Sequence, residues 1–437
     1  MKKIKVNKKL RRKVYLNQKG ITLIALVVTI AVLLILAGVT ISQVFSDDGL
    51  WDAGNEFAEN ANSIIEEKLG EINNVTNELK DVMNPSKQNN LPSTSSTTPY
   101  YPDKTFTNVE GTNLSNGLVI KDSNGNEYVW IEVPKTTTVY PTAGLQITAF
   151  TEDDYTKIET DLHTYTDYYR NGTSFTDTYY SDDVTGLTSA QYTELKQKML
   201  KSVYQNGGFW IGRYEAGITE NGTTSGTPTI APLSKAGTVE DPVYPYTDVT
   251  CSQAQTLASK LSTENYTSSL MFGVQWDLVL KHIEVKEVEQ GTELATIQSE
   301  LNSDSSSWGN YNNATFEINR GKYAKQGALT TWYNYNTASE NTVTYENGKS
   351  TKLSANSSSQ ILLTTGASDT CKKMNIYDLA GNVSEWTLEY SSYTIAPCAL
   401  RGGRCLGNGS AYPSSRRNTD NPTNSFYTVG FRASLYK

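Results

Sequence analysis

An uncharged apolar segment near the start of the chain restricts its fold more than any other feature. No charged residue occurs from Gly20 to Ser46, and residues 21–41, ITLIALVVTIAVLLILAGVTI, are almost continuously aliphatic. At a rise of about 1.5 Å per residue, a helix of this length spans the roughly 30 Å hydrocarbon core of a bilayer. The segment predicts a retained transmembrane helix over residues 21–45, because a cleaved secretory signal is shorter and ends in a small-residue cleavage site.

The charge of the chain is divided between a basic start and an acidic remainder. Residues 1–19 carry nine Lys and Arg and no acidic residue, which leaves 29 basic against 46 acidic residues in the rest. A basic segment beside a membrane helix stays in the cytoplasm, so we expect everything after residue 45 to lie outside a bacterial cell membrane. The remainder, with a net charge of −17, repels polyanions, which argues against nucleic acid as a partner.

The segments after the membrane helix differ in composition. Residues 46–83 repeat apolar residues at intervals of three and four, which predicts an amphipathic stalk helix that packs on a partner or on its own domain. Residues 84–104 are rich in Pro, Ser, Thr and Asn and predict a flexible linker. The main domain is then residues 105–437, with a polar insertion around 135–205 that contains one helix near 189–204.

Strand and helix signals alternate irregularly in the main domain, which predicts an α+β fold. Two alternating apolar runs around a Ser-Asn-Gly-Asn turn predict a β-hairpin at 117–134, and residues 207–218 predict a strand. A helix should begin after Thr250 or Ser252, since either side chain can cap it. Residues 268–283 predict a strand that runs into a helix.

Few residues in the chain favour a metal centre. Its four cysteines show no CxxC spacing, and its two histidines, His163 and His282, lie far apart in sequence, so a structural zinc site and a His-rich centre are both disfavoured. Outside the cell, one disulfide among Cys371, Cys398 and Cys405 is as compatible with the sequence as unpaired buried thiols. We expect no cofactor, and Ca²⁺ binding stays open.

The junction before the apolar segment, QKGITLIALVVTI, resembles a type IV prepilin signal. The resemblance implies cleavage between Gly20 and Ile21, methylation of the new amino terminus, and pilus or pseudopilus subunits as partners. Two positions depart from the family: Ile21 replaces the usual Phe, and Ala25 replaces the usual Glu. That Glu neutralises a neighbouring subunit's amino terminus, so its absence leaves entry into a surface filament open.

The end of the chain contains NIYDLAGNVSEWT, LRGGRC and VGFRASL, and in this order the motifs resemble those of the formylglycine-generating enzyme, or sulfatase-modifying factor, family. Looser matches are FWIGRYEAG at 209–217 and LMFGVQWDLVLKHI at 270–283. The resemblance implies a C-type lectin-like fold, and it assigns a structural role to the motif residues Asp378, Gly381, Asn382, Glu385, Trp386, Arg401, Gly402, Gly403, Gly430, Phe431 and Arg432.

The family's catalytic members use a pair of cysteines after the RGG motif to bind copper and activate oxygen. Aligning the glycines places Gly407 and Tyr412 at those two positions, while Cys405 falls where many relatives have Trp. The related iron-dependent sulfoxide synthases need clustered histidines, which this sequence lacks. The resemblance therefore implies a domain that has kept the frame and lost the oxidase chemistry, and no catalytic residue is assigned.

The stretch between RGG and GFR combines amide, hydroxyl, guanidinium and aromatic groups, a mixture that suits surface recognition of an extracellular protein or glycan. The stretch also resembles that of lectin-like variable proteins of diversity-generating retroelements. Two alternatives remain: an oxidase acting on protein cysteine, and a structural minor pilin or pseudopilin. The candidate ligand-binding residues are Arg404, Asn408, Ser410, Tyr412, Arg416, Arg417, Asn418, Asp420, Asn421, Asn424 and Tyr427.

Overall fold

The computed structural model describes residues 91–437 apart from 171–173, 220–227, 326–330, 338–341 and 355–359. All described residues belong to one unit of the chain, Gln88–Lys437. The predicted cleavage site, membrane helix and stalk lie outside the described residues. Among the helices that are described, none is long and apolar enough to cross a membrane.

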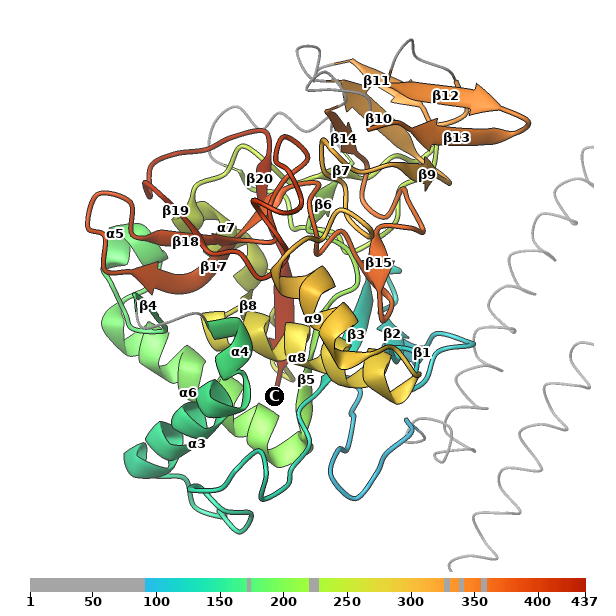
Figure 1. Ribbon diagram of the computed structural model, residues 1–437. Helices are drawn as coiled ribbons and strands as arrows, with labels where there is room; N and C mark the ends of the chain where they lie inside the picture. The colour runs from blue at the N-terminus through green and yellow to red at the C-terminus, as the bar shows by residue number, and fades with distance from the viewer. Residues whose placement is uncertain (1–90, 171–173, 220–227, 326–330, 338–341, 355–359) are drawn as a thin grey trace, which may run out of the picture. The chain divides into compact units, whose positions relative to one another are not determined.

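A six-stranded antiparallel sheet runs through the domain in the order β1-β2-β3-β5-β21-β8 (Figure 1). The predicted hairpin is confirmed, because β2 pairs with β3 and places Val119 opposite Val129. Strand β21 separates β5 from β8, with Ser434 opposite both Ile211 and Ser269. The strands are β1 (Thr107–Asn108), β2 (Val119–Lys121), β3 (Glu127–Glu132), β5 (Gly208–Gly212), β8 (Thr267–Leu270) and β21 (Ala433–Tyr436).

Helices cover this sheet, with α8 packed on β3 and α6 on β5 and β21. Three helices begin with a capping box, in which the side chains of Thr151, Thr188 and Thr250 accept from the third residue's backbone N–H. Thr250, rather than Ser252, therefore caps the predicted helix. The helices are α3 (Glu152–Tyr165), α4 (Asp167–Arg170), α5 (Asp182–Thr185), α6 (Ser189–Asn206), α7 (Cys251–Ser259), α8 (Gly273–Glu289) and α9 (Leu294–Asn302).

A second sheet contains the carboxy-terminal motifs. Its strands lie in the order β19-β18-β17-β20, and β4 pairs with the far end of β17. Strand β17 is parallel to β20, with Trp386 opposite Phe431, and antiparallel to β18, with Glu385 opposite Arg401. The strands are β4 (Phe175–Thr176), β17 (Ser384–Ser391), β18 (Cys398–Arg401), β19 (Asn418–Asp420) and β20 (Val429–Phe431).

Short strands between α9 and the motifs form small separate sheets, drawn in orange at the upper right of Figure 1. Two further two-stranded ladders, β6-β7 and β15-β16, lie beside the motif region. These strands are β6 (Gly217–Ile218), β7 (Tyr244–Pro245), β9 (Phe316–Ile318), β10 (Lys322–Lys325), β11 (Trp332–Asn334), β12 (Val343–Glu346), β13 (Lys349–Lys352), β14 (Ile361–Leu363), β15 (Lys372–Lys373) and β16 (Ile376–Tyr377).

The region 135–205, predicted to be a polar insertion, contributes buried residues to the main core. The helix expected near 189–204 is α6, but the sequence interpretation missed α3. Ile158 and Leu162 of α3 and Tyr169 of α4 are fully buried in the same apolar cluster as the main sheet. The polar composition of α3 concealed its buried face from the sequence interpretation. Two aliphatic residues four positions apart are enough to pack one face of a helix on a core, even when its other faces are mostly Thr, Glu and Asp.

The described part of the predicted linker, residues 91–104, also differs from expectation, because it packs on the sheet. The indole N–H of Trp130 donates to Thr97 Oγ1 at 3.0 Å, and that of Trp210 donates to the Tyr100 carbonyl at 2.9 Å. The ring of Tyr100 meets the Trp130 ring edge-on at 5.6 Å. Buried indoles need hydrogen-bond acceptors, and this segment supplies them.

Candidate functional site

Glu385 of the DLAGNVSEW motif forms a buried ion pair with Arg432 of the GFR motif. Their atoms Oε1 and Nη2 are 2.8 Å apart, and both side chains are almost fully excluded from solvent. The remaining guanidinium N–H groups donate to the carbonyls of Gly212 and Tyr377 at 2.9 and 2.8 Å. One charged pair thus ties β17 and the residue after β20 to the end of β5, which is a structural task.

Asn382 of the same motif lies at the centre of a second buried network. Its amide donates to Glu215 Oε2 at 2.7 Å, and its oxygen accepts from Leu363 N and Asn310 Nδ2, both at 2.9 Å. Asn382 has a φ of 54°, which Asn tolerates better than most residues. Its side chain therefore connects strand β14 with the segments around Glu215 and Asn310, which are distant in sequence.

Three buried carboxyl groups, those of Glu215, Asp378 and Glu385, lie in or beside these networks. Burial raises the pKa of Glu215 well above its usual range, with the charges of Asp378 and Glu385 adding to the effect. Burial also raises the pKa of Glu385 and raises that of Asp378 to about 7. A raised pKa is typical of catalytic acids, but all three side chains have 1% exposure or less. We assign them to the frame, because no substrate can reach them.

Arg417 was predicted to bind ligand, and the structure places it in the core instead. Its guanidinium pairs with Asp277 and, at 2.8 Å, with Glu389, while Arg401 pairs with the same two carboxylates at 2.8 and 3.2 Å. Arg417 also donates to the Tyr169 carbonyl at 2.6 Å. Two buried carboxylates require two cations for charge balance. Arg417 supplies the second cation and is therefore unavailable to a ligand.

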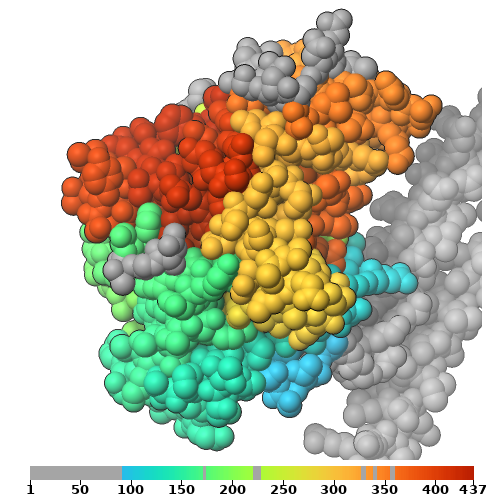
Figure 2. Space-filling model, in the orientation of Figure 1, coloured from blue at the N-terminus to red at the C-terminus, as the bar shows by residue number. Residues whose placement is uncertain are grey.

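The other predicted binding residues stay at least partly accessible. Asn408, Ser410, Arg416 and Asn418 are exposed. The half-exposed ones are Arg404, Tyr412, Asp420, Asn421, Asn424 and Tyr427. Figure 2 shows the carboxy-terminal stretch, in red, gathered at the upper left of this face. Neither Arg404 nor Arg416 forms an ion pair with any residue that the structure describes, so both guanidinium groups can meet an external anion.

Local hydrogen bonds divide these residues into two turns. In the first, Asn408 Oδ1 accepts from the Ser410 backbone and hydroxyl at 2.9 and 2.7 Å. In the second, Asp420 Oδ1 accepts from Asn424 Nδ2 at 2.6 Å, and Asn421 Nδ2 donates to the Ile395 carbonyl at 3.3 Å. Bonds of this kind hold loop backbones in shape while other polar groups stay available.

The second turn contacts a loop that the sequence interpretation missed. Tyr393 and Ile395, between β17 and β18, are 55% and 67% exposed, unusually high values for large apolar side chains. Tyr180 is 37% exposed and donates its hydroxyl to the Thr394 carbonyl at 3.3 Å. The signal was present as two large side chains in the otherwise polar segment SSYTIAP, which could have marked an exposed contact loop.

The cysteines are all buried and unpaired, which settles the two alternatives in favour of free thiols. Burial raises the pKa of Cys405 to about 12 and that of Cys371 further still. Thiolates bind copper, and burial disfavours the thiolate here. At the aligned position of one catalytic cysteine, a side chain on Gly407 would come within 2.9 Å of the Tyr412 ring, so this backbone fits glycine.

The match to a protein-family model agrees with the motifs. A family model described as "Sulfatase-modifying factor enzyme 1-like domain" matches residues 213–435, just over half of the chain. Among solved structures, the chain is similar to "Crystal Structure of CarF", with 15% identity, a TM-score of 0.30 and coverage of 53% of this chain and 87% of that one. It is also similar to Treponema denticola variable protein 1, with 13% identity, a TM-score of 0.27 and coverage of 53% and 85%. No curated protein matches the sequence.

Proposed function

The chain belongs to the sulfatase-modifying factor enzyme 1-like domain family, and from this premise we propose that its domain is a non-catalytic receptor for an extracellular protein or glycan. The binding surface would lie between Arg404 and Tyr427, without Arg417 and with the neighbouring loop of Tyr393 and Ile395. The family's fold supplies the frame for this surface.

One observation carries the proposal. Glu385, Arg401 and Arg432 of the family motifs form ion pairs inside the domain. The stretch between the motifs, in contrast, presents guanidinium, amide and phenol groups at the surface. Arg and Tyr are the side chains that most often dominate binding energy at interfaces. The exposed Ile395 and Tyr393 add apolar area beside them.

An array experiment tests the binding surface. The purified full chain is applied to glycan and protein arrays, together with a variant in which Asn408, Arg416 and Asn418 are all changed to Ala. We expect the triple variant to lose the ligands that the parent retains, because Asn408, Arg416 and Asn418 are exposed within the proposed surface. A matched variant, Glu194→Ala with Lys198→Ala on the exposed face of α6, should retain them. Equal binding by the triple variant and the parent would refute the proposal.

We further propose that residues 21–45 anchor the chain in a bacterial membrane with the domain outside, and that prepilin peptidase cuts after Gly20. The support is the uncharged apolar run and its basic leader. Protease added to intact cells should degrade the domain, and mass spectrometry should find a methylated Ile21 amino terminus. A chain that retains Met1 to Gly20 in cells with active prepilin peptidase would end the cleavage hypothesis.

A further inference from the structure

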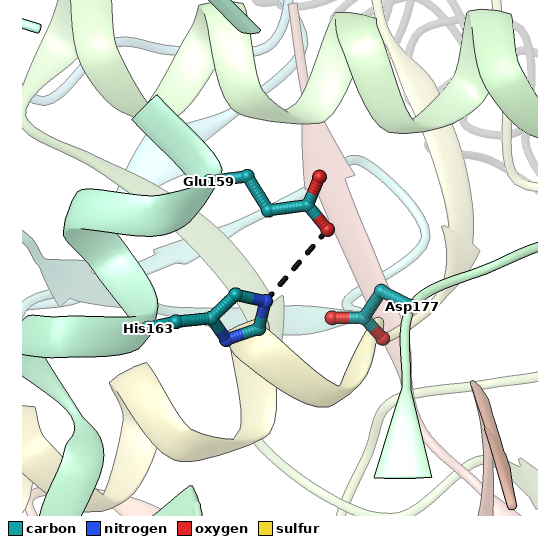
Figure 3. A group of neighbouring side chains, drawn as sticks. All are labelled: Glu159, His163 and Asp177. Atoms are coloured by element: carbon teal, nitrogen blue, oxygen red, sulfur yellow. Dashed lines mark ion pairs between the residues drawn. The ribbon is translucent and has the colours of Figure 1, made fainter. Parts of the chain in front are cut away.

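Three side chains of the kind that bind metal ions lie together away from the carboxy-terminal surface. They are the carboxylates of Glu159 and Asp177 and the imidazole of His163 (Figure 3). One donor atom from each lies within 4.8 Å of the other two, and His163 Nε2 is 3.7 Å from Glu159 Oε1. Small inward movements bring such a set to the spacing that one metal ion requires.

The fold positions all three groups. Glu159 and His163 are four residues apart on α3 and therefore lie on the same face of the helix. Asp177 follows β4 and is 3% exposed. Its two carboxylate oxygens accept from Gly273 N and Val274 N, at 2.6 and 2.9 Å, at the start of α8. Each oxygen keeps a second lone pair, so this anchoring leaves Asp177 able to bind an ion.

A cleft of about 410 Å³ between α3 and α6 opens beside this cluster. Glu159 and Asp177 line this cleft together with Lys196, and Tyr155, Tyr179 and Tyr192 also contribute to its walls. An ion bound by the three side chains would therefore have one side open, as ions in catalytic metal sites do.

A cation of the protein already lies against this cluster. The Lys196 ammonium lies 3.1 and 2.9 Å from the two oxygens of Glu159 and 2.9 Å from the Asp177 carbonyl. The cluster thus favours positive charge, and a metal ion must displace the flexible Lys196 side chain to bind.

We propose that Glu159, His163 and Asp177 form a site for a divalent transition-metal ion of the Zn²⁺ class. Imidazole with carboxylates suits Zn²⁺, whereas Ca²⁺ takes oxygen ligands. Arg170 donates to His163 Nδ1, so the proton sits on Nε2 and points to Glu159. To bind the ion as a neutral imidazole, His163 must carry its proton on Nδ1: Nε2 gives its proton to water, Nδ1 takes one from water, and the half-exposed Arg170 gives up its bond to Nδ1.

The test uses the full chain without a polyhistidine tag and measures Zn²⁺ affinity by competition with a chromogenic chelator. We expect one ion per chain and a loss of more than about 100-fold in His163→Ala, since even indirect partners of a ligand contribute about 10–100-fold. Lys196→Met should raise the affinity by more than about tenfold, because it removes a like charge beside the ion. The matched Glu194→Gln variant, on the outer face of α6, should bind as the parent does.

Two further measurements make the outcome decisive. Co²⁺ bound to the parent should give visible absorption bands that Glu159→Gln loses, and an excess of Ca²⁺ should not displace Zn²⁺. Circular dichroism melts establish that each variant is folded. Unchanged Zn²⁺ affinity in folded His163→Ala, or the lack of Zn²⁺ binding by both the parent and Lys196→Met, would overturn the proposal. Neither result bears on the receptor surface, which is tested separately.

Discussion

Replacing Arg417 with Met would leave the buried carboxylates of Asp277 and Glu389 with Arg401 as their single remaining counter-ion among the described residues. Both acids are less than 5% exposed, so neither can be solvated in place. Removing one partner of a buried ion pair costs about 3–5 kcal/mol. Met fills similar space, so the loss of charge and hydrogen bonds dominates this cost. At about 2.1 cal/mol/K of unfolding entropy per residue over residues 88–437, the melting temperature should fall by roughly 4–7 °C.

The adjacent residue provides the control. Arg416 is exposed and forms no ion pair within the described part of the chain, so Arg416→Met should change the free energy of unfolding by no more than about 0.5 kcal/mol. Urea unfolding followed by tryptophan fluorescence measures both variants. If Arg417→Met unfolds at the same urea concentration as Arg416→Met, the assignment of Arg417 to the frame is wrong, and it returns to the list of ligand-binding residues.

Three further stability predictions follow from the structure. Gly381→Ala should destabilise the domain by more than Gly111→Ala, for which we expect roughly 1–2 kcal/mol. Both glycines have φ near +80°, but only a Cβ at position 381 would lie 2.2 Å from the Asn310 carbonyl oxygen. The urea midpoints of the two variants measure the difference. Lys352 is buried against three backbone carbonyls, and burial lowers its pKa from 10.5 to about 8, so the unfolded state binds more protons between these values. Stability from this group should therefore rise from pH 8 to 10.5, and Lys352→Met should remove the slope. Burial raises the pKa of Asp378 from 3.8 to about 7, so its contribution should fall as pH rises through this range, and Asp378→Asn should remove that fall in unfolding curves taken at successive pH values.

The features predicted most reliably from the sequence are those determined by residues close together in the chain. Alternating apolar runs located the hairpin of β2 and β3, and the Thr250 capping box located α7. The domain motifs were recognised because each requires a specific residue, as Glu385 does for its bond to Arg432. The family match over residues 213–435 bears this out.

Long-range contacts decided the features that the sequence did not show. Nothing near Arg417 in sequence indicates that Asp277, 140 positions earlier, will pair with it. In the same way, Thr97 belongs to a polar segment that is typical of a linker until Trp130 requires an acceptor. The Glu159 and His163 pair had a local signal in its four-residue spacing, but its third member, Asp177, is brought in only by the fold.

The position of β21 between β5 and β8 determines which variants of this protein are exposed to aggregation and proteolysis in the cell. Until residues 433–436 are made, the main sheet consists of the four strands β1-β2-β3-β5 and the separate strand β8, with unpaired edges at β5 and β8. Exposed strand edges promote aggregation and proteolysis. A stop codon or frameshift anywhere between residues 404 and 427 therefore yields a product that cannot close its sheet, whereas substitutions at the exposed positions of this stretch leave closure intact. Only a chain translated in frame through this stretch can therefore form β21 and complete the main sheet.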